Sequence, residues 1–247
     1  MYIYQSLLST SKTKGAAYLV LVDPDKVAPE KLPAFIQQAT VAGADAFLVG
    51  GSLITDDSFE RCIVSIKQNT NVPVVIFPGG VTQVSAKADA ILFLSLLSGR
   101  NPEHLIGNQV LAAPIVKKIG LEAISTAYML VESGKMTSAE FMSNTRPLPR
   151  HKTDIALAHA LAAEILGFKL IYLEAGSGAD QSVPEEIIGA IAKYCSVPLI
   201  VGGGIKTPGD ARKKVAAGAN FIVTGTVFEK NGDATLMKEF AAAIHTK

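Results

Sequence analysis

The chain of 247 residues carries 23 lysines and arginines against 22 aspartates and glutamates, so its net charge is only +1. This balance argues against a nucleic-acid partner. Cys62 and Cys195 are far apart and have no histidine or cysteine at metal-ligand spacing, which argues against a zinc site or a disulfide framework. The N-terminus has no signal-peptide pattern, and the most apolar stretch, residues 88–99, is too short to cross a bilayer, so we expect a cytoplasmic protein.

Short apolar runs alternate with helix-like segments along the whole chain. The expected strands are continuous apolar runs, typical of parallel strands buried on both faces, at residues 16–23, 45–51, 72–79, 89–95, 122–131, 169–176, 197–204 and 220–226. Helix-like segments between them include residues 29–43, 57–70, 151–167, 184–195 and 207–218. This alternation predicts either a TIM barrel or a doubly wound sheet. The number of strands and a length close to the roughly 250 residues of one barrel favour a single (β/α)8 domain over residues 1–247.

The connection between the third and fourth expected strands is unusually short. Only a few residues separate Gly80 from the next strand near Asp89, whereas a crossover that contains a helix needs about 10–12 residues. If both strands are correct, the third outer helix is shortened or missing, and an apolar strip of the barrel is left uncovered.

Glycines follow the seventh and eighth expected strands. Gly202, Gly203 and Gly204 end one strand, and Gly225 with Thr226 ends the next. In TIM barrels the carboxyl ends of these two strands often bind a phosphate group through backbone N–H groups. Glycines that only make tight turns are the alternative explanation.

An acidic segment follows the first expected strand. Asp23 and Asp25 flank a proline, and Ser52 follows the second strand at the same end of the barrel. Oxygen ligands of this kind suit Mg²⁺, which commonly bridges phosphates. An Asp-Pro turn that caps a helix would use the same residues structurally.

The sixth expected strand ends in a tyrosine and a glutamate. Tyr172 and Glu174 stand two residues apart, so their side chains point to the same face of the strand. A carboxylate there could accept a proton from a substrate hydroxyl, and the tyrosine could hydrogen-bond a phosphate or a hydroxyl. The alternative is a pair of polar residues that fill the barrel mouth.

Seven segments together carry a family resemblance: "LVDPDK", "FLVGGS", "IFPGG", "FLSLLSGRNP", "YLEAGSG", "VGGGIKTP" and "VTGTVFE". They closely resemble the geranylgeranylglyceryl phosphate synthases, and most of all the branch that has bacterial as well as archaeal members. The combination of "YLEAGSG" with "GGGI" is specific, whereas the glycine loops alone are shared with many phosphate-binding barrels. The resemblance extends over almost the whole chain.

The resemblance implies a modified TIM barrel that transfers a long prenyl group from its diphosphate to the 3-hydroxyl of sn-glycerol 1-phosphate. The donor that it implies first is geranylgeranyl diphosphate. It implies Mg²⁺ as cofactor, a homo-oligomer (dimer or hexamer), and a groove for the prenyl tail where the third helix is lacking. Apart from the resemblance, peripheral contact with a membrane surface is compatible with the apolar stretch at residues 88–99. By motif, Asp23 and Ser52 match the magnesium positions, and Glu174, with Tyr172 beside it, matches the residue expected to orient or deprotonate the acceptor hydroxyl. The glycerol phosphate site is matched by Tyr172, Leu173, Glu174, Ala175, Gly176, Ser177, Gly178, Gly203, Gly204, Gly225 and Thr226.

One position departs from the pattern of the smaller bacterial relatives. They have a lysine two residues before the first aspartate, where this chain has Leu21. A basic contact to substrate must then come from elsewhere, and Lys26 and Arg100 are the candidates.

Two other functions fit part of the pattern. A phosphosugar isomerase or cyclase shares the two phosphate-binding strand ends, but it would need a second carboxylate opposite Asp23, and Glu132 comes late after the fifth strand. A non-catalytic phosphate binder would need neither Asp23 nor Glu174.

Overall fold

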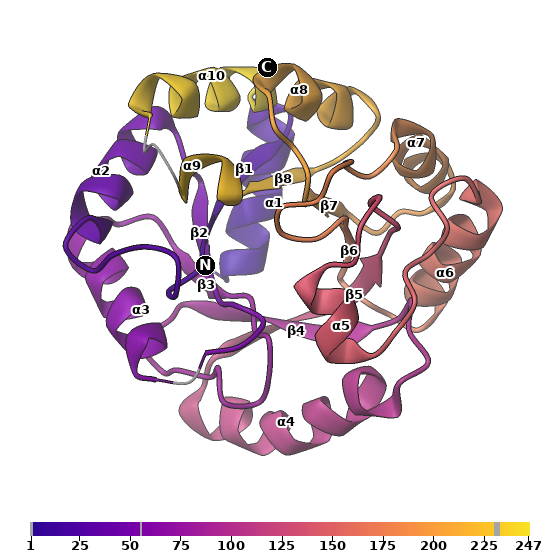
Figure 1. Ribbon diagram of the computed structural model, residues 1–247, viewed down its shortest axis with the longest axis horizontal. Helices are drawn as coiled ribbons and strands as arrows, with labels where there is room; N and C mark the ends of the chain where they lie inside the picture. The colour runs from indigo at the N-terminus through magenta and orange to yellow at the C-terminus, as the bar shows by residue number, and fades with distance from the viewer. Residues whose placement is uncertain (1, 55, 230–232) are drawn as a thin grey trace.

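Eight parallel strands close into a barrel, viewed down its axis in Figure 1. The computed structural model describes residues 2–54, 56–229 and 233–247. The strands pair in chain order, and β8 returns to β1 with Phe221 opposite Ala17, so no sheet edge is left open. They are β1 (Ala17–Val22), β2 (Ala46–Val49), β3 (Val74–Ile76), β4 (Ala90–Leu96), β5 (Glu122–Leu130), β6 (Leu170–Glu174), β7 (Leu199–Gly202) and β8 (Phe221–Thr224). The predicted barrel is confirmed.

Helices surround the strands in a ring (Figure 1). The ring consists of α2 (Leu32–Ala42), α3 (Ser58–Asn69), α4 (Asn108–Ile119), which continues the π-helical turn η1 (Glu103–Gly107), α6 (Thr153–Ile165), α7 (Glu185–Tyr194), α8 (Pro208–Ala216) and α10 (Ala234–Ile244). Two short helices, α5 (Ser138–Ser143) and α9 (Thr226–Glu229), belong to the loops after β5 and β8, and α1 (Ile3–Lys14) precedes the barrel.

Local sequence explains where these helices form and which face they bury. In α3, Phe59, Cys62, Ile63 and Ile66 recur at helical spacing and are all buried against the barrel. At the start of α8, the Thr207 side chain accepts a hydrogen bond from the Asp210 backbone N–H, and proline occupies the first helical position.

The connection from β3 to β4 contains no helix within the described residues, as its length predicted. In Figure 1 this leaves the sector between α3 and α4 without an outer helix. The outward-facing Ile91 and Phe93 of β4 therefore have no helix directly over them. Phe93 remains partly exposed.

Alternation along the strands divides the apolar side chains into two clusters. Inward positions such as Leu19, Leu48 and Leu92 form the cluster inside the barrel, and the intervening residues pack against the ring of helices. Helix α1 covers the amino-terminal end of the barrel: Leu7 joins the inner cluster, and the Ile3 and Tyr4 N–H groups donate to the Glu122 carboxylate at 2.6 and 3.1 Å. The opposite end, where the carboxyl ends of the strands lie, is the end at which TIM barrels bind their ligands.

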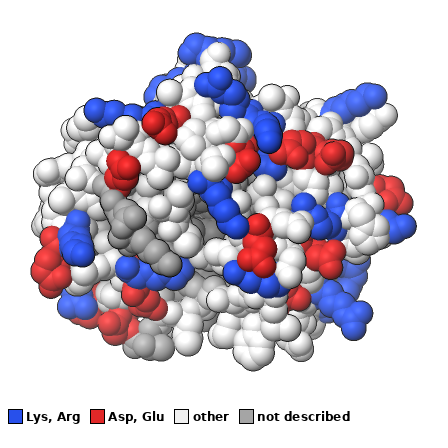
Figure 2. Space-filling model, turned by 45° about the horizontal axis from the view of Figure 1, so that its top comes forward, with Lys and Arg blue, Asp and Glu red and all other residues white. Residues whose placement is uncertain are grey.

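Charges of both signs are interspersed on the face shown in Figure 2, in keeping with the balanced composition. Among the helices of the described residues, none is long and apolar enough to span a membrane.

Candidate active site

A cavity of about 830 Å³ opens at the carboxyl ends of the strands. Residues that follow β1, β2, β3, β6, β7 and β8 line it, and α5 contributes one wall. The cavity continues onto the outer surface of β4, because Val84, Ile91 and Phe93 also line it. A polar chamber at the barrel mouth thus joins an apolar groove in the sector that lacks a helix.

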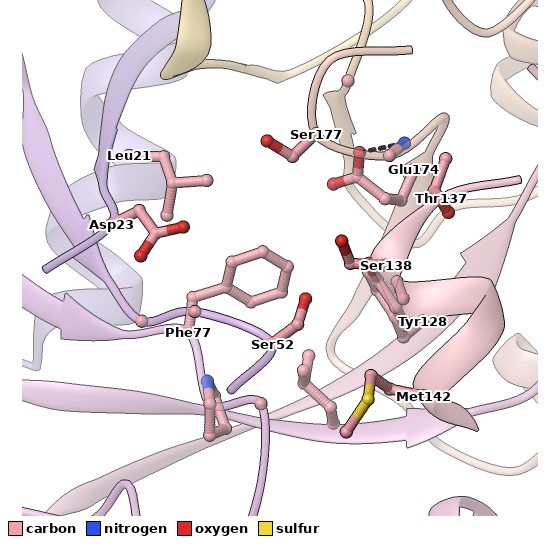
Figure 3. Close-up of a pocket in the computed structure, with 18 of the residues that line it drawn as sticks. Leu21, Asp23, Ser52, Phe77, Tyr128, Thr137, Ser138, Met142, Glu174 and Ser177 are labelled. Atoms are coloured by element: carbon pink, nitrogen blue, oxygen red, sulfur yellow. Dashed lines mark hydrogen bonds between the residues drawn. The ribbon is translucent and has the colours of Figure 1, made fainter. Parts of the chain in front are cut away.

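Glu174 lines the polar chamber, at the end of β6. Its side chain is almost fully buried, and one carboxylate oxygen accepts a hydrogen bond from the Gly176 N–H at 2.6 Å (dashed in Figure 3). The Tyr172 hydroxyl, two residues earlier on the same face, is buried and makes no geometrically satisfactory hydrogen bond with any described residue. Both side chains line the cavity, as their spacing predicted. A buried hydroxyl beside a carboxylate at the wall of a cavity is suited to binding a polar ligand.

Burial sets the protonation of these groups. It raises the pKa of Glu174 from its ordinary value of 4.5 to about 7, although the Gly176 N–H and Tyr172 act in the opposite direction. Burial, followed by the negative charge of Glu174, raises the pKa of Tyr172 and of Tyr128 well above 10. The phenols therefore stay protonated near neutral pH, while Glu174 can take up or release a proton there.

The glycines after β7 are required by close approach as well as by backbone conformation. Gly203 and Gly204 have φ of +78° and +67°, values that other residues rarely adopt. A Cβ atom on Gly203 would lie 2.2 Å from a Glu174 carboxylate oxygen, and one on Gly202 would lie 2.5 Å from the Tyr172 hydroxyl. The backbone of this turn thus lies directly against the two polar side chains, with its N–H groups available to an anion.

The loop after β6 contacts the segment that follows β8 at the edge of the chamber. The Ser177 and Thr226 hydroxyls lie 3.0 Å apart, and the Lys26 ammonium donates to Ser177 at 3.1 Å. Gly176, Ser177, Gly178, Gly225 and Thr226 all line the cavity. Hydroxyls, backbone N–H groups and a lysine therefore converge from three strands, which is the chemistry of a phosphate site.

Two lysines hold the β6–α7 loop in place. Lys206 donates to the Asp180 carbonyl at 3.0 Å, and the buried Lys214 donates to the Val183 carbonyl at 2.6 Å and to the Glu185 carboxylate at 2.7 Å. These contacts fix the loop between Gly176 and α7, and Lys206 also lines the cavity.

Asp23 and Ser52 line the same cavity, and in Figure 3 Asp23 lies on the side opposite Glu174. One Asp23 oxygen is 3.0 Å from the Lys26 ammonium and the other accepts from the Asp25 N–H at 3.3 Å. No cluster of three or more His, Cys, Asp or Glu side chains suited to a metal occurs among the described residues. A divalent ion here would need oxygen ligands from a substrate, as Mg²⁺ commonly has.

The structure separates the two basic candidates. Lys26 lines the cavity, whereas Arg100 does not: its guanidinium donates to the Gly99 carbonyl at 2.8 Å and lies 3.4 Å from His159. The structure thus brings Lys26, but not Arg100, to the cavity. Leu173 and Ala175 also lie outside the cavity, since they face the outer cluster on alternate positions of the strand and its extension.

Sequence reasoning missed several residues that line the cavity. Phe77 and Tyr128 lie on its floor and Ser138 on its α5 wall (Figure 3). The alternation Ile124, Thr126, Tyr128 along β5 could have indicated that Tyr128 points inward.

A buried carboxylate beside a glycine-lined anion site at the mouth of a (β/α)8 barrel defines a TIM-barrel enzyme for phosphorylated substrates. Residues 10–244 match the PcrB family, and the chain belongs to that family. It is 49% identical over 229 residues to the geranylgeranylglyceryl phosphate synthase of Flavobacterium johnsoniae, covering 93% of this chain and 94% of the relative. It is 45% identical over 239 residues to that of Thermococcus kodakarensis, covering 96% and 92%.

The fold also matches a solved structure from this family. The crystal structure of (S)-3-O-geranylgeranylglyceryl phosphate synthase from Thermoplasma acidophilum in complex with sn-glycerol-1-phosphate superposes with a TM-score of 0.94. Its sequence is 34% identical, and the match covers 99% of each chain. The predicted family resemblance is confirmed.

Proposed function

We propose that the protein transfers a prenyl group from a prenyl diphosphate, geranylgeranyl diphosphate above all, to the 3-hydroxyl of sn-glycerol 1-phosphate. The products are a prenylglyceryl phosphate ether and diphosphate. The observation that carries this proposal is the continuous cavity, in which a phosphate chamber with a buried carboxylate opens into an apolar groove. The names of the relatives and the glycerol phosphate complex of the similar structure support it.

The acceptor fits the chamber between β6, β7 and β8. Backbone N–H groups of Gly203, Gly204 and Gly225 and the hydroxyls of Ser177 and Thr226 would hold its phosphate. The buried Tyr172 hydroxyl would donate to the acceptor, and Glu174, with a pKa of about 7, would accept the proton of the attacking hydroxyl.

The donor fits the opposite side of the cavity. Its tail would lie in the groove over Ile91 and Phe93, and its diphosphate would lie near Asp23 and Lys26. Holding the two substrates in one cavity with the reacting atoms in line supplies a large part of the rate acceleration. A direct test measures diphosphate release, which should require both glycerol 1-phosphate and the prenyl donor. Release with the donor alone would point to hydrolysis and contradict the proposal.

We further propose Mg²⁺ as the cofactor, held by the Asp23 carboxylate, the Ser52 hydroxyl and oxygens of the diphosphate. The donor set fits, because a single carboxylate plus substrate phosphates is a common Mg²⁺ environment. Such an ion would neutralise charge on the leaving diphosphate. Lys26 supplies a second positive charge on that side and is paired with Asp23 at 3.0 Å.

Replacing Asp23 by asparagine should weaken Mg²⁺ activation. The variant keeps the shape but loses the negative charge, so we expect the Mg²⁺ concentration for half-maximal activity to rise at least about tenfold. Titration of Mg²⁺ at saturating substrates measures this shift, and Asp57→Asn, which changes an exposed carboxylate outside the cavity, serves as the matched control. An unchanged Mg²⁺ dependence in Asp23→Asn would exclude Asp23 as a ligand.

The isomerase or cyclase alternative finds no support in the cavity. Glu132, the carboxylate that follows β5, is exposed and does not line it, and β5 presents Tyr128 there instead. Among the described lining residues, the carboxylates are Asp23, Asp25 and Glu174. None of them stands at the end of β5, where acid–base isomerisation would need a partner for Asp23.

We also propose that the protein forms a homo-oligomer, either a dimer or a hexamer. Its support is an apolar surface on η1 and α4, where Ile106, Val110, Leu111 and Ile115 are each about half exposed or more. Light scattering coupled to gel filtration should give a multiple of 25.9 kDa. Leu111→Glu should lower that mass if this surface is the contact, and a monomeric wild type would contradict the proposal.

A further inference from the structure

Three aromatic rings form the floor of the cavity. Phe77 stacks on Tyr172 with centroids 5.0 Å apart and planes 17° apart. Tyr128 packs edge-on against both, at 5.7 Å from Phe77 and 5.4 Å from Tyr172. All three rings line the cavity and cover the top of the apolar cluster inside the barrel. This packing fixes the orientation of the Phe77 ring.

One face of Phe77 remains available to a ligand. Tyr172 covers the other face, and Phe77 is only partly buried, so its exposed area borders the cavity. In Figure 3 the ring lies between Asp23 on one side and Glu174 on the other. A prenyl carbon that leaves a diphosphate near Asp23 for a hydroxyl near Glu174 would pass over this ring.

We infer that the face of Phe77 stabilises the positive charge that develops on the allylic carbons of the donor, and that Tyr128 is a positioning residue for the ring. This inference rests on the proposed prenyl transfer. In that step the C1–O bond to diphosphate breaks, and its electron pair leaves with the diphosphate. The glycerol 3-hydroxyl oxygen bonds to C1, and its proton passes to Glu174.

An aromatic ring suits this charge better than a charged group would. A carboxylate in contact with an allylic cation would trap it as an ester, whereas a ring face attracts the cation without forming a bond to it. The neighbouring Leu21 side chain adds no opposing positive charge. A desolvated cation–π contact is worth about 2 kcal/mol, which corresponds to roughly 30-fold in rate.

The sharpest test changes the electron density of the ring and leaves its shape nearly unchanged. Phe77 is replaced by mono-, di- and trifluorophenylalanine through site-specific incorporation, and the single-turnover rate of ether formation is measured. We expect the rate to fall with each added fluorine, by a similar factor each time. The trifluoro variant should be roughly 10- to 30-fold slower than the wild type. The same series at Phe35, which lies on α2 outside the cavity, is the matched control and should stay within about twofold of wild type.

Tyr128 is tested through its effect on that series. Tyr128→Phe keeps the ring and should retain the full fluorine dependence at position 77. Tyr128→Leu removes the edge contact, so the rate should no longer depend on the number of fluorines at position 77. General destabilisation of the protein would not abolish that dependence.

Two results would overturn the inference: a rate that does not follow fluorination at position 77, or a Phe77→Leu variant within about twofold of wild type. A wild-type enzyme that forms no ether would instead refute the proposed function. The two failures are therefore distinguishable.

Discussion

Glu174→Gln should lower kcat by about 10²- to 10⁴-fold, because the amide cannot accept the proton of the attacking hydroxyl. The Gly176 N–H, which donates to a Glu174 oxygen at 2.6 Å, can still donate to the amide oxygen, so the site should keep its shape. Steady-state kinetics with both substrates saturating measure this loss. The matched control is Glu132→Gln, which changes an exposed carboxylate outside the cavity and should leave kcat unchanged. Near-normal turnover in Glu174→Gln would remove this carboxylate from the reaction.

The raised pKa of Glu174 gives the same residue a signature in the pH profile. The base must be ionised to accept a proton, and its pKa in the folded protein is about 7. The wild-type kcat/KM should therefore fall about tenfold per pH unit below 7 and reach a plateau above it. The Glu174→Gln variant should lack this inflection, whereas Glu132→Gln should retain it. An inflection that persists in Glu174→Gln would assign the titration to another group.

As pH rises, the free energy of unfolding should decrease while the activity increases. The pKa of Glu174 is about 7 in the fold and 4.5 as its ordinary value, so the folded state holds the extra proton between these values. The free energy of unfolding of the wild type should then decrease as pH rises from 4.5 to 7. Above pH 7, Glu174→Gln should be more stable than wild type by roughly 1–3 kcal/mol, and below pH 4.5 the difference should disappear. Denaturant unfolding at several pH values measures this.

Gly203→Ala is the second substitution for which we expect a large effect. The backbone there has φ of +78°, and the new Cβ would lie 2.2 Å from a Glu174 oxygen and 2.5 Å from the Gly176 nitrogen. The clash must displace the β7–α8 turn or the carboxylate, so kcat/KM for glycerol 1-phosphate should fall by about 100-fold or more. The strained backbone should also reduce the free energy of unfolding by about 1–3 kcal/mol.

A matched control separates the local clash from the general effect of losing a glycine. Gly189 lies in α7, where an added Cβ would meet only the Ala217 carbonyl oxygen at 3.8 Å. Gly189→Ala should keep full activity and gain up to about 1 kcal/mol of stability, since alanine is the better helix former. Equal activity of Gly203→Ala and Gly189→Ala would contradict the close approach in the site. Calorimetric titration with glycerol 1-phosphate would show whether any loss lies in binding.

The parts of the fold that depend on short stretches of chain could be predicted from the sequence. The apolar runs along the chain predicted the eight strands of the barrel. The short connection between Gly80 and Asp89 predicted that the third outer helix is shortened or missing, because chain length limits what a crossover can contain. The two-residue spacing of Tyr172 and Glu174 placed both side chains at the barrel mouth, since side chains of a strand alternate.

The features that could not be predicted depend on contacts between distant segments. The segment before Gly15 carried no functional prediction, yet α1 covers the barrel end through Glu122, more than a hundred residues away. Arg100 lies outside the cavity, because the strand that a long side chain follows does not decide the direction in which it points. The stacking of Phe77 on Tyr172 depends on the closed barrel, which places β3 and β6 across from each other.

The measurement that tests the central claim most directly is product analysis with labelled sn-glycerol 1-phosphate, Mg²⁺ and prenyl diphosphates of increasing length. We predict a labelled product that extracts into organic solvent and has the mass of a prenylglyceryl phosphate, with geranylgeranyl diphosphate as the best donor. Gly203→Ala assayed in parallel should give little of it. If no donor yields an extractable labelled product although glycerol 1-phosphate still binds, prenyl transfer is not the reaction of this site.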